Sequence, residues 1–551
     1  MNTVTATKAP AQAAPAAGGN ALAGTRTLIR FNLRRDRIRL PVWILALFLG
    51  TLSTASNYKT LYATAKQQAS VVKTMDTPAG LAMTGPRHYL DDYNFGSMMG
   101  HQMLGFMAVM VGLMSVLIIT RHTRNEEETG RAELVRSTVV GQHAHLAAAL
   151  TVAVLANLVL ALLLAFGLGG MGIDGIDTGG SLLYGLIHAV IGIVFATVAA
   201  ITVQITPHTR AASGTALAVI GGAYVLRAAG DSGDNALAWL SPIGWVQRTY
   251  VYVDNRWWPL LFCLALAGIC GTVAFVLSTK RDVGAGLRAA KLGSPVASDA
   301  LARPFGFALR LHRGMLFGFG AGLLLMGAMY GSILGQADDM LKDIDQIKDA
   351  LDRIGGTTMA ESFASMVMVI LSVVAAVYVV MATLRPRAEE TAGRAEPLLS
   401  TGLSRGRWVG SHLAVALAGG TLMLLLGGLG IGIAGAASTS DGGLFLKLVG
   451  ASLAYAPALW VTVGVAVMLF GWLPRASAAA WAVPVYAFVV GYLGELLQFP
   501  GWMKNLSPFG HIPQLPAADL NWTPLIVLTV LAAGLIWLGL AGFNRRDLET
   551  K

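Results

Sequence analysis

A short charged stretch occurs twice in the chain, and its residue types suit binding to another protein better than catalysis. The first copy, residues 124–138, reads RNEEETGRAELVRST, and the second, residues 387–401, reads RAEETAGRAEPLLST. The two copies match at most positions. Neighbouring carboxylates and guanidinium groups form ion pairs and charge-assisted hydrogen bonds. Because one such surface is presented twice, it would suit a symmetric partner.

The rest of the sequence shows no pattern typical of an active site. Neither the G-x-x-x-x-G-K-[ST] motif nor a Gly-Lys dipeptide occurs, so we expect no P-loop for ATP in this chain. The histidines are scattered without an H-E-x-x-H motif, and Cys263 and Cys270 share one apolar run, which indicates packing residues. We therefore expect no catalytic residue, no metal site and no cofactor bound by this chain.

A row of methionines could contact an apolar ligand. Met103, Met107, Met110 and Met114 have the spacing of one helical face, and only Met366 keeps the pattern in the second half of the chain. Flexible thioether side chains adapt to ligands of different shapes, so this face could line a path for bulky apolar compounds. Ordinary helix packing is the alternative interpretation. An asymmetric path is expected, since the second half lacks most of the row.

The composition indicates that these residues are carried by membrane helices. Of the 551 residues, 55% are hydrophobic and only 13% are charged, which is far from the composition of a soluble domain. Apolar runs of roughly 20 residues can cross a bilayer as helices. The predicted spans are residues 41–57, 101–120, 146–170, 181–205, 213–229, 257–278, 314–334, 362–383, 410–436, 446–471, 477–494 and 524–543.

The two halves of the chain repeat each other beyond the charged stretch. Lys280-Arg281-Asp282 recurs as Arg545-Arg546-Asp547, for example. We predict an all-α polytopic membrane protein with twelve transmembrane helices in two parallel six-helix repeats. The predicted parts are a disordered tail (1–25), the first half (26–290), a cytoplasmic linker (291–304) and the second half (305–551). Basic residues concentrate in the loops that would be cytoplasmic with the N-terminus inside, so both termini and both charged stretches are expected there.

A second repeated motif precedes the last span of each half. It comprises Ser241, Pro242 and Gly244 in the first half and Ser507, Pro508 and Gly510 in the second. Ser-Pro favours the start of a turn or helix, and few charged residues follow. We expect residues 240–250 and 506–515 to dip back towards the membrane and form an outer gate; helices resting on the outer surface are the alternative.

Charged residues near the spans are few. Arg227 and Glu495 lie near the outer end of the fifth helix of their halves, where they could serve a transport path or extend to the interface. Before the first span, residues 27–40 form a basic amphipathic segment that could lie in the headgroup layer or simply flank the span.

Taken together, these residues resemble a known family. Six helices per half, the EEETGRAE-type loop after the second helix and LSPxG before the sixth are similar to permeases of ABC-2 type exporters. The resemblance is closest to fused twelve-helix permeases that export polyketide antibiotics (tetronasin type), and it covers nearly the whole chain after residue 25.

The resemblance implies a role for each motif. The basic segment would be an elbow helix, the charged loops would rest on an ATPase, and the outer segments would be re-entrant. The implied ATPase-coupling residues are Glu126, Glu127, Gly130, Arg131, Glu133, Glu389, Glu390, Gly393, Arg394 and Glu396. The second copy has Pro397 where the first has Leu134. Because proline breaks the interior of a helix, the helices of the two loops need not have the same length.

The resemblance also implies partners and a location. ATP and Mg would be bound by two copies of a separate P-loop ATPase subunit, while this chain contacts membrane lipid and a hydrophobic small-molecule substrate, and no nucleic acid. The expected location is the plasma membrane.

Two other functions compete with this interpretation. A proton-coupled secondary multidrug transporter can also have twelve helices in parallel halves, but few carboxylates lie within the spans here. Transport that survives ATP depletion and collapses with the proton gradient would favour it. A membrane enzyme acting on lipid would need a nucleophile or metal cluster, and the sequence shows neither.

Overall fold

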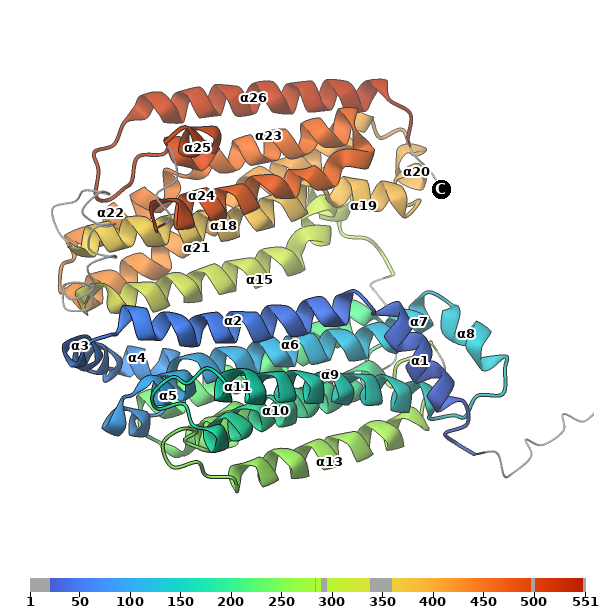
Figure 1. Cartoon of the computed structure of the whole chain (residues 1–551). Coiled ribbons are helices and arrows are strands. Elements are labelled where there is room, and N and C mark those ends of the chain that lie inside the picture. The colour runs from blue at the N-terminus through green and yellow to red at the C-terminus, as the bar shows by residue number, and fades with distance from the viewer. Residues whose placement is uncertain (1–19, 283, 289–294, 337–358, 497–500, 549–551) are drawn as a thin grey trace, which may run out of the picture. The chain divides into compact units, whose positions relative to one another are not determined.

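Long apolar helices dominate the computed structural model, which describes residues 20–282, 284–288, 295–336, 359–496 and 501–548 (Figure 1). Within these residues, eleven helices are long and apolar enough to cross a membrane, and no strand occurs. The protein is a multi-pass all-α membrane protein, as its hydropathy predicts. Most of the tail predicted to be disordered, and part of the predicted linker, lie outside the described residues.

A helix is present at each of the predicted spans. In the first half these helices are α2 (Arg39–Leu61), α6 (Leu104–His122), α9 (Ala144–Gly169), α10 (Thr178–Ile205), α11 (Thr209–Ser232) and α13 (Pro259–Ser278). In the second half they are α15 (Pro304–Ile333), α18 (Met359–Thr383), α21 (Arg405–Thr439), α22 (Gly443–Leu453) with α23 (Ala456–Trp472), α24 (Ala482–Leu496) and α26 (Trp522–Arg545). The span predicted at 477–494 is divided between η5 (Pro474–Trp481), a 3₁₀ segment, and α24, whose 15 residues make it the shortest of these helices apart from α22.

The chain divides into two compact units. Unit 1 comprises residues 1–63 and 75–292, and unit 2 comprises residues 64–74 and 293–551. Each unit has its own hydrophobic core, and the same order of helices recurs in each. In both units the charged stretch lies at one end of the helices, which we call the loop end.

In unit 1 the core is built around α10. This helix packs against α6, α9, α11 and α13. Gly192 faces Asn157 of α9, whose side-chain amide also donates to the hydroxyl of Ser115 on α6 at 2.9 Å. Small residues and side-chain hydrogen bonds of this kind hold membrane helices together, since lipid gives no hydrophobic drive for association. By contrast, only 28% of the apolar window of α2 and 22% of that of α13 is buried, so their outer faces suit lipid.

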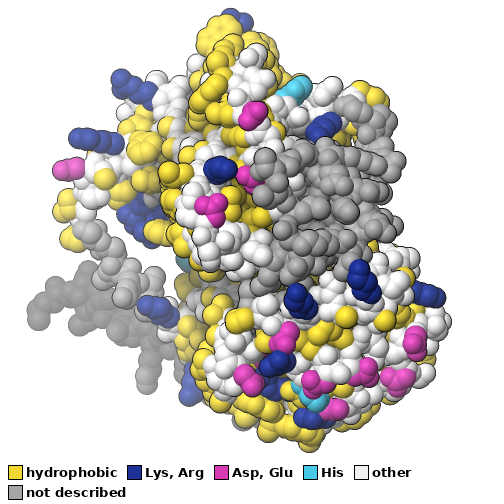
Figure 2. Space-filling view, turned by 90° about the vertical axis from the view of Figure 1, so that its left-hand side faces the viewer, with side chains coloured by type: hydrophobic (Ala, Val, Ile, Leu, Met, Phe, Trp, Pro, Cys, Tyr) yellow, Lys and Arg dark blue, Asp and Glu magenta, His cyan; other side chains and the backbone are white. Residues whose placement is uncertain are grey.

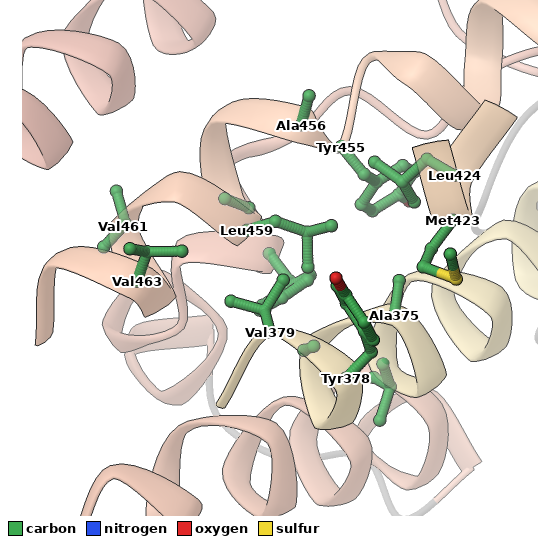
Figure 3. Packing of buried hydrophobic residues seen from close by; sticks show 14 of the residues in the cluster. Ala375, Tyr378, Val379, Met423, Leu424, Tyr455, Ala456, Leu459, Val461 and Val463 are labelled. Carbon is green, nitrogen blue, oxygen red and sulfur yellow. The ribbon is translucent and has the colours of Figure 1, made fainter. Parts of the chain in front are cut away.

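In unit 2, glycines bring α15 and α21 into close backbone contact. A Cβ at Gly327 would overlap the carbonyl oxygen of Gly427, and one at Gly430 would overlap that of Leu324. Around Tyr378, residues of α18, α21 and α23 interdigitate, including Val379, Met423 and Leu459 (Figure 3). Close backbone approach thus replaces bulky side chains at one interface, while interlocking side chains fill the other.

Besides the span that begins with η5, two spans depart from regular α-helix. The second span begins with α5 (Phe95–Met98) and a π-helical turn, η2 (Met99–Met103), before α6 continues it. The tenth span is interrupted at Ala454 and Tyr455 between α22 and α23, because Pro457 has no N–H for the helical ladder. Hydropathy alone predicts both spans as uninterrupted, so these local breaks are corrections.

Short helices complete both ends of the units. At the loop end lie α1 (Thr25–Arg35), α7 (Arg124–Glu128), α8 (Arg131–Arg136), α14 (Asp299–Ala302), α19 (Arg385–Thr391) and α20 (Ala395–Leu399). At the opposite end lie α3 (Ala65–Met75), α4 (Pro78–Met83), η1 (Arg87–Asp92), η3 (Ala236–Leu240), α12 (Pro242–Gln247), η4 (Leu334–Gln336), α25 (Gly501–Leu506) and η6 (Pro508–His511).

Candidate functional site

Each charged stretch folds as two short helices joined by a glycine. In unit 1, α7 ends before Gly130, which has a φ of 72°, and α8 follows directly. Space around Gly130 is open, since nothing lies within 4 Å of a Cβ built there. Glycine is therefore needed for its left-handed backbone conformation, which other residues adopt at a cost, and not for close packing.

Unit 2 repeats this design with little change. Gly393 has a φ of 69° and separates α19 from α20. Pro397 is the third residue of α20, within the first turn, where its missing N–H would have no intrahelical partner. The two helices that follow the glycines have six and five residues, so the proline leaves their lengths nearly equal.

The base of each loop is a buried ion-pair network. In unit 1, Glu127 accepts hydrogen bonds from Arg281 at 2.6 and 2.9 Å and from Arg124 at 2.7 Å. Arg124 is fully buried and also donates to the backbone carbonyl of Val203. Because burying a charge is costly unless it is paired, these contacts stabilise the loop base in one geometry.

The corresponding carboxylate in unit 2 has matching partners. Glu390, 1% exposed, accepts a two-pronged bond from Arg546 at 2.7 and 2.8 Å and lies 3.4 Å from Arg387. The adjacent Glu389 pairs with Arg385 at 3.0 Å and with Arg394 at 2.6 Å. In unit 1 the equivalent Glu126 pairs with Arg35 of α1 and lies 3.9 Å from Arg131.

The tips of the loops, in contrast, are open to solvent. Arg131 and Glu133 are exposed in unit 1, as are Arg394 and Glu396 in unit 2. Of the residues predicted to couple to an ATPase, these four offer charged groups to a soluble partner. The glutamates before the glycines have internal partners at the loop base, and a coupling role for them stays a prediction.

Sequence reasoning missed Arg281 and Arg546 as members of this site. Arg281 lies three residues after α13 and Arg546 directly after α26, both far in sequence from the charged loops. The repeated Lys280-Arg281-Asp282 and Arg545-Arg546-Asp547 were the signal that could have identified them. Repetition marked the positions, but only the fold shows which carboxylates they meet.

The predicted elbow segment is a separate helix in unit 1. Leu28 of α1 is buried against Ala144 and Ala148 of α9. Asp36, at the bend between α1 and α2, pairs with His122 at 2.6 Å and with Arg121 at 3.0 Å, both at the end of α6. The helix is therefore attached to the end of the span that carries the charged loop.

The repeated LSPxG motif forms a compact turn at the opposite end. Ser241 caps α12 and donates to the carbonyl of Ala223 at 2.6 Å. A Cβ at Gly244 would overlap the carbonyl oxygen of Ala238, and one at Gly510 would overlap that of Lys504. Glycine in this motif is thus required because the chain passes over its own preceding turn.

The first outer segment is buried by the helices of unit 1. α12 packs against α6, α10, α11, α13 and η3. Ile243 and Gln247 are fully buried, and the Gln247 amide donates to the carbonyl of Thr84 at 2.6 Å. In unit 2, Pro508 begins a single 3₁₀ turn, η6, with Phe509 5% exposed. A gating role for either segment stays a prediction.

Arg227 does not face an open path. It is fully buried, stacks on the ring of Tyr224 at 4.3 Å and lies 3.7 Å from Asp231, which pairs with Arg248 at 3.0 Å. Asp231 and Arg248 line a cavity of about 570 Å³ with Trp239. Figure 2 faces this end of the helices and shows acidic, basic and histidine side chains gathered on unit 1. The side chain of Glu495 lies outside the described residues.

The methionine row is only partly buried, and it is not on one regular helix. Met103 closes the π turn, whereas Met107, Met110 and Met114 belong to α6. Met107 and Met114 are buried, and Met103, Met110 and Met366 are half-buried. Their role in a substrate path stays a prediction. Unit 2 also has an apolar cavity of about 540 Å³ between α22, α23 and α26, lined by Trp460 and Trp522 among others.

In the part of the chain that the structure describes, no group of three or more His, Cys, Asp or Glu side chains could hold a metal ion. The charged groups at the loop ends form ion pairs and hydrogen bonds with one another. Such an arrangement can bind and position a partner surface.

Comparison with known proteins identifies the family. The family described as the multidrug efflux system permease Rv1217c, C-terminal domain, matches residues 26–277 and 301–544. The chain is also 38% identical over 545 residues to the multidrug efflux system permease protein Rv1217c of Mycobacterium tuberculosis (strain ATCC 25618 / H37Rv), covering 96% of each protein. Both matched stretches contain a charged loop with its glycine and its buried glutamates. The chain therefore belongs to the Rv1217c family of multidrug efflux permeases.

Proposed function

We propose that this chain is the membrane subunit of an ATP-driven exporter of hydrophobic drugs, with ATP and Mg bound by a separate subunit. The observation that carries the proposal is the charged loop with a rigid base and an exposed tip, built twice. One loop in each unit would receive one copy of a P-loop ATPase, so that two identical copies bind one permease.

The exposed charges support a protein partner. Arg131 and Glu133 offer both signs of charge, which suits a folded partner with complementary charges. A buried base would let such a partner push on the loop without deforming it. Export energy would then come from closure of the two ATPase copies.

The proposed substrate class is inferred from the family. The relative is named a multidrug efflux permease, and we infer that this chain exports hydrophobic compounds, polyketide antibiotics of the tetronasin type among them. We place the protein in the plasma membrane with both termini and both loops in the cytoplasm, as the positive-inside rule predicts.

Purification with and without the ATPase subunit tests the proposal. The isolated chain should not hydrolyse ATP, and it should co-purify with two copies of one P-loop ATPase. In inside-out vesicles, accumulation of a hydrophobic dye should require ATP and persist when a protonophore collapses the proton gradient. Hydrolysis by the chain alone, or uptake that needs the proton gradient and ignores ATP, would refute the proposal and favour a proton-coupled transporter.

A further inference from the structure

Both units hold their charged loop through an arginine that follows their last helix. We propose that Glu127–Arg281 and Glu390–Arg546 are clamps that make each charged loop move together with the last helix of its own unit. This proposal rests on the proposed function, because it concerns how motion of a bound ATPase would reach the membrane helices. It makes Arg281 and Arg546 positioning residues, since they act through the loops and contact no substrate.

In unit 1 the clamp joins three elements. Arg281 follows the end of α13 and bonds both oxygens of Glu127 at the base of the loop. Its Nε donates to the side chain of Gln204 at 2.5 Å, at the C-terminal end of α10. The segment after α13 also continues onto α10, where Leu287 donates its backbone N–H to the carbonyl of Gln204 at 3.0 Å.

In unit 2 the clamp also joins the loop to neighbouring helices, through a different set of contacts. Arg546 follows the last residue of α26 and bonds both oxygens of Glu390. Its guanidinium lies 5.0 Å from the ring centres of both Phe470, at the end of α23, and Phe543 of α26. Its backbone carbonyl accepts from Arg405 of α21 at 2.6 Å.

Both clamps differ from a surface ion pair because their side chains are mostly buried. Glu127 and Glu390 are 9% and 0% exposed in their side chains, and Arg281 and Arg546 are 8% and 14% exposed. Each carboxylate also has an arginine partner within the loop, Arg124 for Glu127 and Arg387 for Glu390. Breaking the buried bond to the arginine after the last helix is nevertheless costly, so the loop and that arginine should move together. A planar guanidinium bonds both oxygens at once, which fixes orientation as well as distance.

The position of the clamp decides where a force would go. The third contact is Gln204 in unit 1 and Phe470 in unit 2, each near the end of the fourth span of its unit. A push on the exposed loop tip would thus act on the fourth and sixth spans together, without bending the loop at its base. In both units the clamp connects the charged loop with the fourth and sixth spans, although the contacts differ. This recurrence argues against chance packing.

Removal of the arginines in the full permease–ATPase complex tests the clamps. Arg281→Gln and Arg546→Gln are compared with Lys280→Gln and Arg545→Gln, which remove the same charge at exposed neighbouring positions. In inside-out vesicles we would measure Nile red, or another hydrophobic dye that wild type first proves to accumulate, per ATP hydrolysed. The clamp variants should keep bound, hydrolysing ATPase but transport about tenfold less dye per ATP, and the controls should match wild type.

A second measurement separates the clamp from the ATPase. In the permease without its partner, the backbone amides of residues 124–138 should exchange hydrogen faster in Arg281→Gln than in wild type. Lys280→Gln should exchange at the wild-type rate. Arg281→Lys keeps the charge but cannot make the bidentate contact, so it should show an intermediate effect in both measurements. If Arg281→Gln does not fold, Glu127→Gln with Arg281→Gln removes both charges of the clamp, leaves Arg124 its bonds to the carbonyls of Val203 and Ala285, and takes its place.

Two results would overturn the clamp. One is normal dye transport per ATP in a variant whose loop exchanges faster, because the loop would then be loose and still coupled. The other is unchanged exchange in the loop after the arginine is lost. A wild-type permease that binds no ATPase would instead overturn the proposed function, and exchange would still show whether the pairs hold the loops.

Discussion

Glycine plays two different physical roles in the repeated motifs. In the charged loops, Gly130 and Gly393 supply a backbone with positive φ in open space. In the LSPxG motif, Gly244 and Gly510 leave room for a carbonyl oxygen of the preceding turn. Comparison of the two halves of the sequence finds all four glycines. It does not show which of them are required for a positive φ and which for close packing.

The packing role predicts a clear effect of one added methyl group. Gly244→Ala should destabilise the protein by about 1 to 3 kcal/mol, because a Cβ would overlap the carbonyl oxygen of Ala238 and the turn would have to shift. Gly222→Ala in α11 is the matched control, since nothing lies within 4 Å of its Cβ. Thermal unfolding in detergent measures both. Equal unfolding temperatures for the two variants would contradict the packing role.

Charge partners are the residue-level feature that sequence predicts least well. The charged loops were found as repeated sequence, and a carboxylate there was expected to contact a partner protein. The structure also gives Glu127 and Glu390 partners within the chain, because Arg281 and Arg546 follow helices that return to the loop end. Such a pairing depends on which helices pack side by side, and hydropathy does not predict that. The contact with a partner protein stays a prediction.

At the scale of elements, hydropathy predicts the helices well and their internal breaks poorly. All twelve predicted spans contain helix, since a long apolar run must satisfy its backbone groups internally in lipid. The π turn at Met99–Met103 and the break before Pro457 were missed. Averages over a window of about 20 residues conceal a change in one turn.

The outer segments give an element-scale prediction. Ile243 is fully buried and Phe509 is 5% exposed, while the nearby Leu240 and Leu506 are 66% and 69% exposed. Cysteine at 240 or 506 should react with a bulky membrane-impermeant maleimide from outside, and cysteine at 243 or 509 should react at least about tenfold more slowly, because burial excludes the reagent.

These measurements need Cys263→Ala and Cys270→Ala in the background, since both cysteines are free. If a buried position reacts faster in one state of the ATP cycle, the segment opens and a gate is supported. Rapid labelling at 243 or 509 in every state would contradict the buried outer segments. Slow labelling in every state would leave them as fixed plugs, which argues against a gate.

At the scale of the whole molecule, duplication is the property from which function follows. The family match covers residues 26–277 and 301–544, and each stretch contains a loop with a buried base and an exposed tip. The sequence predicted two such loops correctly as repeated features. It did not show that the exposed charges are confined to a few tip residues of each loop, because burial depends on the fold around each loop.

The number of bound ATPase copies gives the last prediction. Glu133→Arg and Glu396→Arg each reverse one exposed tip charge and leave the buried base pairs intact. Charge reversal that costs even about 1.4 kcal/mol weakens binding tenfold, so each single variant should retain one ATPase copy at a limiting concentration, and the double variant none. Native mass spectrometry of the detergent complex counts the copies. Asp441→Arg, exposed at the opposite end of unit 2, is the control and should keep two. Two copies on the double variant would show that the loop tips do not bind the ATPase; loss of both copies from each single variant would show instead that the ATPase binds only as a preformed pair spanning both loops.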